Sequence, residues 1–73
     1  MDVKQAMHLA NYKRPVLAKV PISGDAENYV QCKRISEVSY VVPENGGSFW
    51  AAVCIGVVGN ASYRVRIENL KEA

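Results

Sequence analysis

The stretch SFWAAVCIGVVGN, from Ser48 to Asn60, decides how this chain folds, because its residues Phe49 to Val58 carry no charge and no strongly polar group. A membrane span needs about 20 apolar residues in a row, and this run is too short and is interrupted by Gly56. A phosphate-binding loop needs glycines followed by a helix, whereas a strand-like pattern follows Gly59 here. The stretch is therefore predicted to be a buried β-strand over about 48–58.

Turn residues and a second strand-like run precede this segment. Residues 43–47, PENGG, are typical of a hairpin loop. The run 29–42 is rich in β-branched and aromatic residues and is predicted to be a long strand paired with 48–58. Its apolar positions change parity near residues 33–35, which indicates a bulge or a sharp bend. The buried stretch is then the central strand of a strongly curved sheet, with a bend at Gly56.

A second hairpin follows, because Gly59 and Asn60 form a tight turn and residues 61–67 alternate regularly. The alternation predicts which side chains face the core and which face solvent: Tyr63, Val65 and Ile67 inward, and Ser62, Arg64 and Arg66 outward. Residues 68–73, ENLKEA, are expected to form one short helical turn and a frayed end, with Leu70 closing one mouth of the sheet.

The N-terminal part is predicted to hold a short helix and a first strand. Asp2 and Gln5 have the spacing of a capping box, and Asn11 can end a helix over about 2–11. Its apolar stripe consists of Val3, Ala6, Met7 and Ala10. A strand over about 15–20 follows, and Pro21 limits its pairing to an edge or an end. A polar turn is predicted from Ser23 to Asn28.

The composition indicates one folded domain over residues 1–73. Hydrophobic residues make up 49% of the chain and charged residues 22%, and the net charge of +2 is too small to imply a nucleic-acid or membrane partner. The N-terminus MDVKQAMHL does not resemble a secretion signal. We therefore expect a cytoplasmic location, no membrane contact, and reduced, buried thiols at Cys32 and Cys54.

Residues suited to catalysis or ligand binding are few. One His and two Cys without close spacing make a poor set of metal ligands. His8 has no carboxylate, Ser or Cys near it in sequence, which favours an exposed helical side chain. No nucleophile has a base beside it, and a small barrel is filled by its own side chains. We expect no enzyme activity, no metal, no cofactor and no small-molecule substrate.

One polar feature indicates binding. Basic side chains on two strands could form a strip with aromatic side chains beside it, as in proteins that bind single-stranded nucleic acid. The candidate binding face consists of Lys33, Arg34, Tyr40, Trp50, Arg64 and Arg66, and Tyr29 is a further aromatic candidate. The alternative is a solvated face whose charges prevent edge pairing. Glu37 and Glu68 dilute the positive charge and favour this alternative.

Several of these features recur together in one family. The order of Pro15-Val16, a polar turn, Tyr29, Arg34-Ile35, Val38, Tyr40, a loop, a buried strand and the ending NASYRVRIENL resembles short prophage-encoded proteins of Gram-positive bacteria. The resemblance implies a mainly β fold, namely a small SH3-like, five-stranded, partly open barrel with a short N-terminal helix. Those proteins have no assigned biochemical role. The chain lacks the acidic and aromatic loops with which signalling SH3 domains hold proline-rich ligands, so that activity is not expected.

Three functions follow as expectations. The first, which we favour, is a non-enzymatic interaction module of a phage or prophage that binds a protein partner. The second is a structural component of a phage particle, which would associate with itself. The third is a weak nucleic-acid binder that uses the basic strand face.

Overall fold

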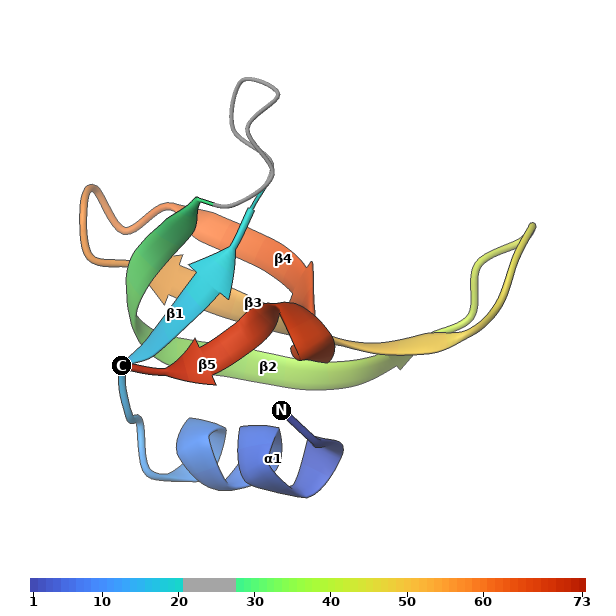
Figure 1. Cartoon of the computed structure of the whole chain (residues 1–73), viewed down its shortest axis with the longest axis horizontal. Helices are drawn as coiled ribbons and strands as arrows, with labels where there is room; N and C mark the ends of the chain where they lie inside the picture. Colours follow the sequence, from blue (N-terminus) through green and yellow to red (C-terminus); the bar gives the residue numbers. More distant parts are fainter. Residues whose placement is uncertain (21–27) are drawn as a thin grey trace.

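The computed structural model describes residues 1–20 and 28–73, and it shows one helix and one antiparallel sheet of five strands (Figure 1). The elements are α1 (Val3–Asn11), β1 (Val16–Lys19), β2 (Tyr29–Val41), β3 (Phe49–Gly56), β4 (Ser62–Arg66), the 3-10 turn η1 (Ile67–Asn69) and β5 (Leu70–Glu72). The strand order is β4-β3-β2-β1-β5. In the described residues β4 and β5 do not pair with each other, so the sheet curls without closing. The predicted mainly β fold with a short N-terminal helix is confirmed.

β2 bends because it carries an extra residue at two positions. Its register with β3 shifts between Cys32 and Arg34 and again between Ile35 and Glu37. The two bulges keep the apolar side chains of Cys32, Ile35 and Val38 on the inner face, which packs against the core. The sequence predicts one slip near 33–35, and the second slip restores the original parity for the rest of the strand.

β3 is the central strand that the sequence predicts, since it pairs with β2 on one side and β4 on the other. It ends at Gly56, however, and the prediction that it continues to residue 58 is wrong. Val57 and Val58 belong to the turn and are 54% and 87% exposed. Gly59 and Asn60 both have positive φ, 68° and 54°, which gives the predicted tight turn.

Gly56 is required by close packing. A Cβ atom at this position would lie 2.9 Å from Cε2 of Tyr63, which is across the ladder on β4. The predicted inward direction of Tyr63 is confirmed, because its half-buried ring packs against the core. Glycine here therefore lets an aromatic ring cover the backbone of the central strand.

The helix begins and ends close to the predicted residues. The side chain of Asp2 accepts a hydrogen bond from the backbone N–H of Gln5 at 2.7 Å. The last helical residue is Asn11, but the left-handed conformation that ends the helix belongs to Lys13, with φ 52°.

The apolar face of α1 differs from the predicted stripe. Ala6 and Leu9 are buried in the core, and Val3 and Ala10 are half-buried against it. Met7 is 41% exposed, so its place in the stripe is wrong and Leu9 takes that place. The cause is that α1 packs against β2 along the face centred on Ala6 and Leu9.

The chain end forms a strand that the sequence does not predict. After the helical turn η1, residues Leu70–Glu72 pair with β1, which itself pairs with β2 on its other side. β1 is therefore an interior strand, which excludes the edge position; it ends at Lys19, before Pro21, which agrees with the alternative that Pro21 marks an end of the pairing. Leu70 is buried in the core, but it begins this paired strand, so the expectation of a frayed end after the helical turn is wrong. Pro21 and the polar turn from Ser23 lie outside the described residues, apart from Asn28 at the end of that turn.

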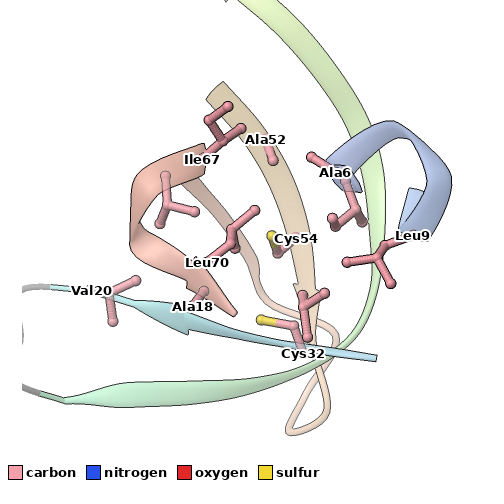
Figure 2. Packing of buried hydrophobic residues seen from close by; sticks show 12 residues of the cluster. Ala6, Leu9, Ala18, Val20, Cys32, Ala52, Cys54, Ile67 and Leu70 are labelled. Carbon is pink, nitrogen blue, oxygen red and sulfur yellow. The ribbon is translucent and has the colours of Figure 1, made fainter. Parts of the chain in front are cut away.

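The core is small and uncharged. Side chains from the helix and from all five strands meet in one cluster (Figure 2). Both cysteines lie inside it, free and at most 1% exposed. Among the described residues no buried side-chain nitrogen or oxygen lacks a hydrogen-bond partner. Within the same ranges, no helix has the length and apolar character needed to cross a membrane.

Candidate binding surfaces

The six residues of the predicted binding face lie in three different places. Three of them share the outer face of the sheet. Two lie on the inner face, which is the opposite side of the same strands. The sixth, Lys33, is the extra residue of the first bulge, and its ammonium group donates a hydrogen bond to the side chain of Asn60 in the β3–β4 turn.

Arg34, Arg64 and Arg66 form the outer group. Their neighbours on β3 are Ile55, Val53 and Ala51, respectively. These neighbours alternate with the core residues of the central strand, so they and the arginines point away from the core. The prediction that Arg64 and Arg66 face outward is confirmed, and the bulges place Arg34 on the same face.

Other contacts weaken this basic group. The guanidinium of Arg66 lies 4.1 Å from the centre of the Phe49 ring, and its Nη1 is 3.8 Å from Oε1 of Glu68. Glu37 lies two strands from Arg64 in the same row, with Val53 between them. The outer face is therefore a mixed surface of aliphatic side chains, arginines and acids. The acids offset part of its positive charge.

Tyr40 and Trp50 form the inner group. They are opposite each other on β2 and β3, with ring centroids 5.2 Å apart. Trp50 packs against the core, whereas Tyr40 is 55% exposed. The predicted stacking partner Tyr29 is elsewhere, with the ammonium of Lys71 4.2 Å from its ring centre. The aromatic and basic residues of the predicted face therefore do not form one surface.

The aromatic pair lies on a projecting part of the β2–β3 hairpin, residues 39–50, which we call the arm. Figure 1 shows the arm extending away from the curled sheet. β1 pairs with β2 over Tyr29–Cys32, and β4 reaches β3 at Ala51. In the described part of the chain, Ser39–Val41 thus pair with β3 alone, and the other backbone edge of β2 is unpaired there.

The two backbone edges of the arm differ in how far other parts of the chain cover them. On the β3 side, η1 packs against the strand and the Arg66 side chain lies over Phe49. On the β2 side, α1 reaches the strand at Ser36, Glu37 and Val38, where it forms one wall of an open groove. Beyond Val38 this edge is bare, and Val42 at its end is 72% exposed.

Sequence reasoning did not find this edge, although a signal for it exists. Residues 38–43, VSYVVP, contain no charged side chain, and Glu37 and Glu44 flank them. A β-prone segment without charge is a candidate for pairing with another strand. Its exposure could not be read from the pattern, because it depends on where β1 and β4 stop.

The buried thiols are poorly suited to chemistry. Burial raises the pKa of Cys32, and burial together with the neighbouring Cys32 thiol raises the pKa of Cys54 to about 12. Both groups are therefore protonated at neutral pH, and the thiol is a much weaker nucleophile than the thiolate. Across residues 1–20 and 28–73, no group of three or more His, Cys, Asp or Glu could hold a metal ion.

His8, the remaining candidate for acid–base chemistry, is exposed on α1 as predicted. Its ring packs against Tyr12, with centroids 4.6 Å apart.

In comparisons with protein-family models, curated proteins and solved structures, the chain matches none of them.

Proposed function

We propose that this protein is a small non-enzymatic interaction module that binds an extended segment of a protein partner along the free β2 edge of the arm. In this mode a new strand adds to a sheet, main-chain hydrogen bonds supply affinity, and alternate side chains supply specificity. The observation that carries the proposal is the unpaired edge at Ser39–Val41, which lies beside the exposed side chains of Tyr40 and Val42.

Comparison with the other strand edges supports the choice of the arm. Native proteins protect exposed edges with charged side chains. The edge strand β4 carries Arg64 and Arg66, and the edge strand β5 carries Lys71 and Glu72. The arm has no charge from residue 38 to residue 43. It is therefore the edge on which a partner strand would meet neither electrostatic repulsion nor a desolvated ion.

The resemblance to short prophage proteins supports a wider assignment. Under this proposal the open sheet is an SH3-like barrel, and η1 is the short turn before its last strand. The protein would act in the cytoplasm of a Gram-positive host, where free thiols persist. A regulatory role and a structural role in the phage particle both agree with strand addition at the arm.

A titration with a synthetic peptide tests the proposed function. The probe is an octapeptide of alternating valine and threonine, and the control has proline at its two central positions, because proline cannot donate to a ladder. We expect the first peptide alone to shift the backbone amide NMR signals of Ser39–Val42 and to slow their hydrogen exchange. Equal effects from both peptides, or shifts confined to β4 or β5, would show that the arm is not a strand-binding edge.

A second candidate function rests on the three arginines of the outer face. Because Arg34, Arg64 and Arg66 point the same way, they could contact the phosphates of a single-stranded nucleic acid. Such binding falls steeply as salt is added. A salt titration with a single-stranded oligonucleotide tests it: affinity that is absent at low salt, or that the R64E/R66E variant retains, would exclude this face.

A further inference from the structure

The free edge of the arm has a defined boundary on each side. The bulge at residues 35–37 and the wall formed by α1 limit it on one side. On the other side stands Pro43, which has no N–H to donate to a ladder. Five residues remain, Val38–Val42, of which Val42 directly follows the last residue of β2, Val41. The midpoint of this segment is Tyr40.

We propose that the strand that pairs with this edge is the same segment of a second copy of the chain. The inference rests on the proposed function, since it names the partner of that same edge. Two identical strands that pair antiparallel about a twofold axis meet at their midpoints. Tyr40 therefore lies opposite Tyr40 of the second copy. Val38 of each copy lies opposite Val42 of the other copy.

Charge placement fits this register. Glu37 and Glu44 flank the uncharged segment on its two sides. Continued by one and two residues, the register sets Glu37 opposite Pro43 and Glu44 opposite Ser36. No acid lies directly opposite another acid, which would be destabilising. A self-pairing edge needs such a pattern, because each of its charges occurs twice.

Shape also fits. The groove between α1 and β2 has a volume of about 300 Å³ and lies beside Val38. Its lining residues are Met7, Ala10, Asn11, Ser36, Glu37 and Val38. Because Val42 of the second copy lies opposite Val38, its exposed side chain would enter this groove and contact the exposed Met7. Twofold symmetry repeats the contact, so two exposed valines are covered at once.

Pairing of the arms joins the sheets of the two copies. Strands β4, β3 and β2 of one copy continue into β2, β3 and β4 of the other, and the edge of each arm disappears. The Tyr40 rings meet across the axis, where an aromatic cross-strand pair adds stability. The outer face with its arginines remains open to solvent in this dimer.

Cysteine cross-linking tests the register. Directly opposite residues have Cβ atoms about 4.5–5.5 Å apart, so Tyr40→Cys is expected to form an intermolecular disulfide with oxidised glutathione. Val42→Cys is the matched control, because its two copies would be separated by four residues of strand, about 14 Å. Cys32 and Cys54 are at most 1% exposed and stay reduced. Equal cross-linking of the two variants, or none, would overturn the register.

Light scattering and a charge substitution test the dimer itself. We expect the wild-type chain to show twice its mass of 8.0 kDa at high concentration. Val42→Glu should weaken the dimer about tenfold or more, because its carboxylate would lie beside Val38 and Met7 and close to Glu37 in the lining of the groove. Val58→Glu adds the same charge at an even more exposed valine in the β3–β4 turn and should leave the dimer intact. Equal weakening by both substitutions would overturn the assigned contact.

These outcomes separate the two proposals. A chain that stays monomeric at millimolar concentration refutes pairing with a second copy. If the valine–threonine peptide still shifts the amide signals of the arm, the proposed function of strand binding stands. If Val42→Glu does not weaken the dimer and the peptide shifts no amide signal of the arm, both proposals are refuted and self-association belongs to another surface.

Discussion

The body and the arm of the β2–β3 hairpin differ, and the difference explains which part stabilises the fold and which part can bind a partner. The body comprises Cys32–Val38 with the facing part of β3. It is irregular, with two bulges, yet it contains the fully buried Ile35 and both thiols. The arm has a regular ladder, Tyr40 with Trp50 and Val41 with Phe49, but much of it is exposed. Regular pairing and burial therefore vary independently along one hairpin.

The bulges are the physical cause of this difference. Each extra residue bends β2 and increases its twist, so the body wraps around the core and has neighbours on both faces. The arm has no register shift and continues past the core. Substitutions in the body should therefore change the free energy of unfolding, whereas substitutions in the arm should change binding.

The largest expected effect separates the two regions directly. Ile35→Ala removes a large, fully buried side chain and should lower the free energy of unfolding by about 2–5 kcal/mol. Val41→Ala, in the arm and half-buried, should cost about 1 kcal/mol or less. Urea unfolding followed by Trp50 fluorescence measures both. Similar losses would mean that the arm contributes to stability as much as the body does.

A second pair of substitutions probes how tightly each region is packed. Gly56→Ala puts a Cβ 2.9 Å from the Tyr63 ring and should destabilise the body by about 1–3 kcal/mol. The control is Gly47→Ala in the loop of the arm, where a Cβ would meet no atom within 4 Å. This change should stay within about 0.5 kcal/mol. A neutral Gly56→Ala would show that Tyr63 moves freely.

The thiols of the body predict a dependence on alkaline pH. The folded state holds the pKa of Cys54 at about 12, above the ordinary value of 9.0, so folding favours the protonated form. This stabilisation is complete below pH 9 and is lost as the pH rises from about 9 towards 12, where the unfolded thiol ionises first. Between pH 8 and 10 the loss should be about 1–2 kcal/mol.

The control for this pH dependence is Cys54→Ala, which removes the group that titrates. Its unfolding free energy, measured in urea at pH 8 and pH 10, should fall less than that of the wild-type chain. Identical decreases in the two proteins would mean that Cys54 can ionise in the folded state. The buried position of the thiol would then not protect it.

The sequence predicts several elements outside the arm well because their signals are local. The apolar run of β3, the turn at Gly59-Asn60, the alternation of β4 and the cap at Asp2 each depend on neighbouring residues, and the structure has all four. A parity change in β2 was also visible. The number of bulges was not, because a second slip restores the starting parity and leaves a pattern like that of a regular strand.

The features that sequence missed depend on distant pairing. β5 has three residues, of which Leu70 alone is buried, and it is a strand only because β1 lies beside it. The bare edge of the arm likewise depends on where β1 leaves β2. For the candidate site, the outward direction of Arg64 and Arg66 followed from alternation. The placement of Tyr40 and Arg34 on opposite faces of the sheet did not follow from alternation, because it depends on both bulges.

The smallest expected effect concerns the outer face of the sheet. Arg66 has two weak contacts, with the Phe49 ring and with Glu68, and exposed contacts of these kinds contribute about 0.5–1 kcal/mol or less each. Arg66→Met keeps an unbranched stem and removes the charge, so it should cost about 1 kcal/mol at most. Arg64→Met, two residues away on the same face, is the matched control and should be neutral within about 0.5 kcal/mol.

Light scattering on the same two variants tests whether the outer face takes part in the dimer contact of the arm. Arg66 covers Phe49 at the base of the arm on its β3 side, whereas the proposed pairing uses the β2 side. Both variants should therefore keep the dimer mass and the Tyr40→Cys cross-link. If Arg66→Met abolishes them and Arg64→Met does not, the partner strand binds along β3, and the arm uses the edge that η1 and Arg66 partly cover.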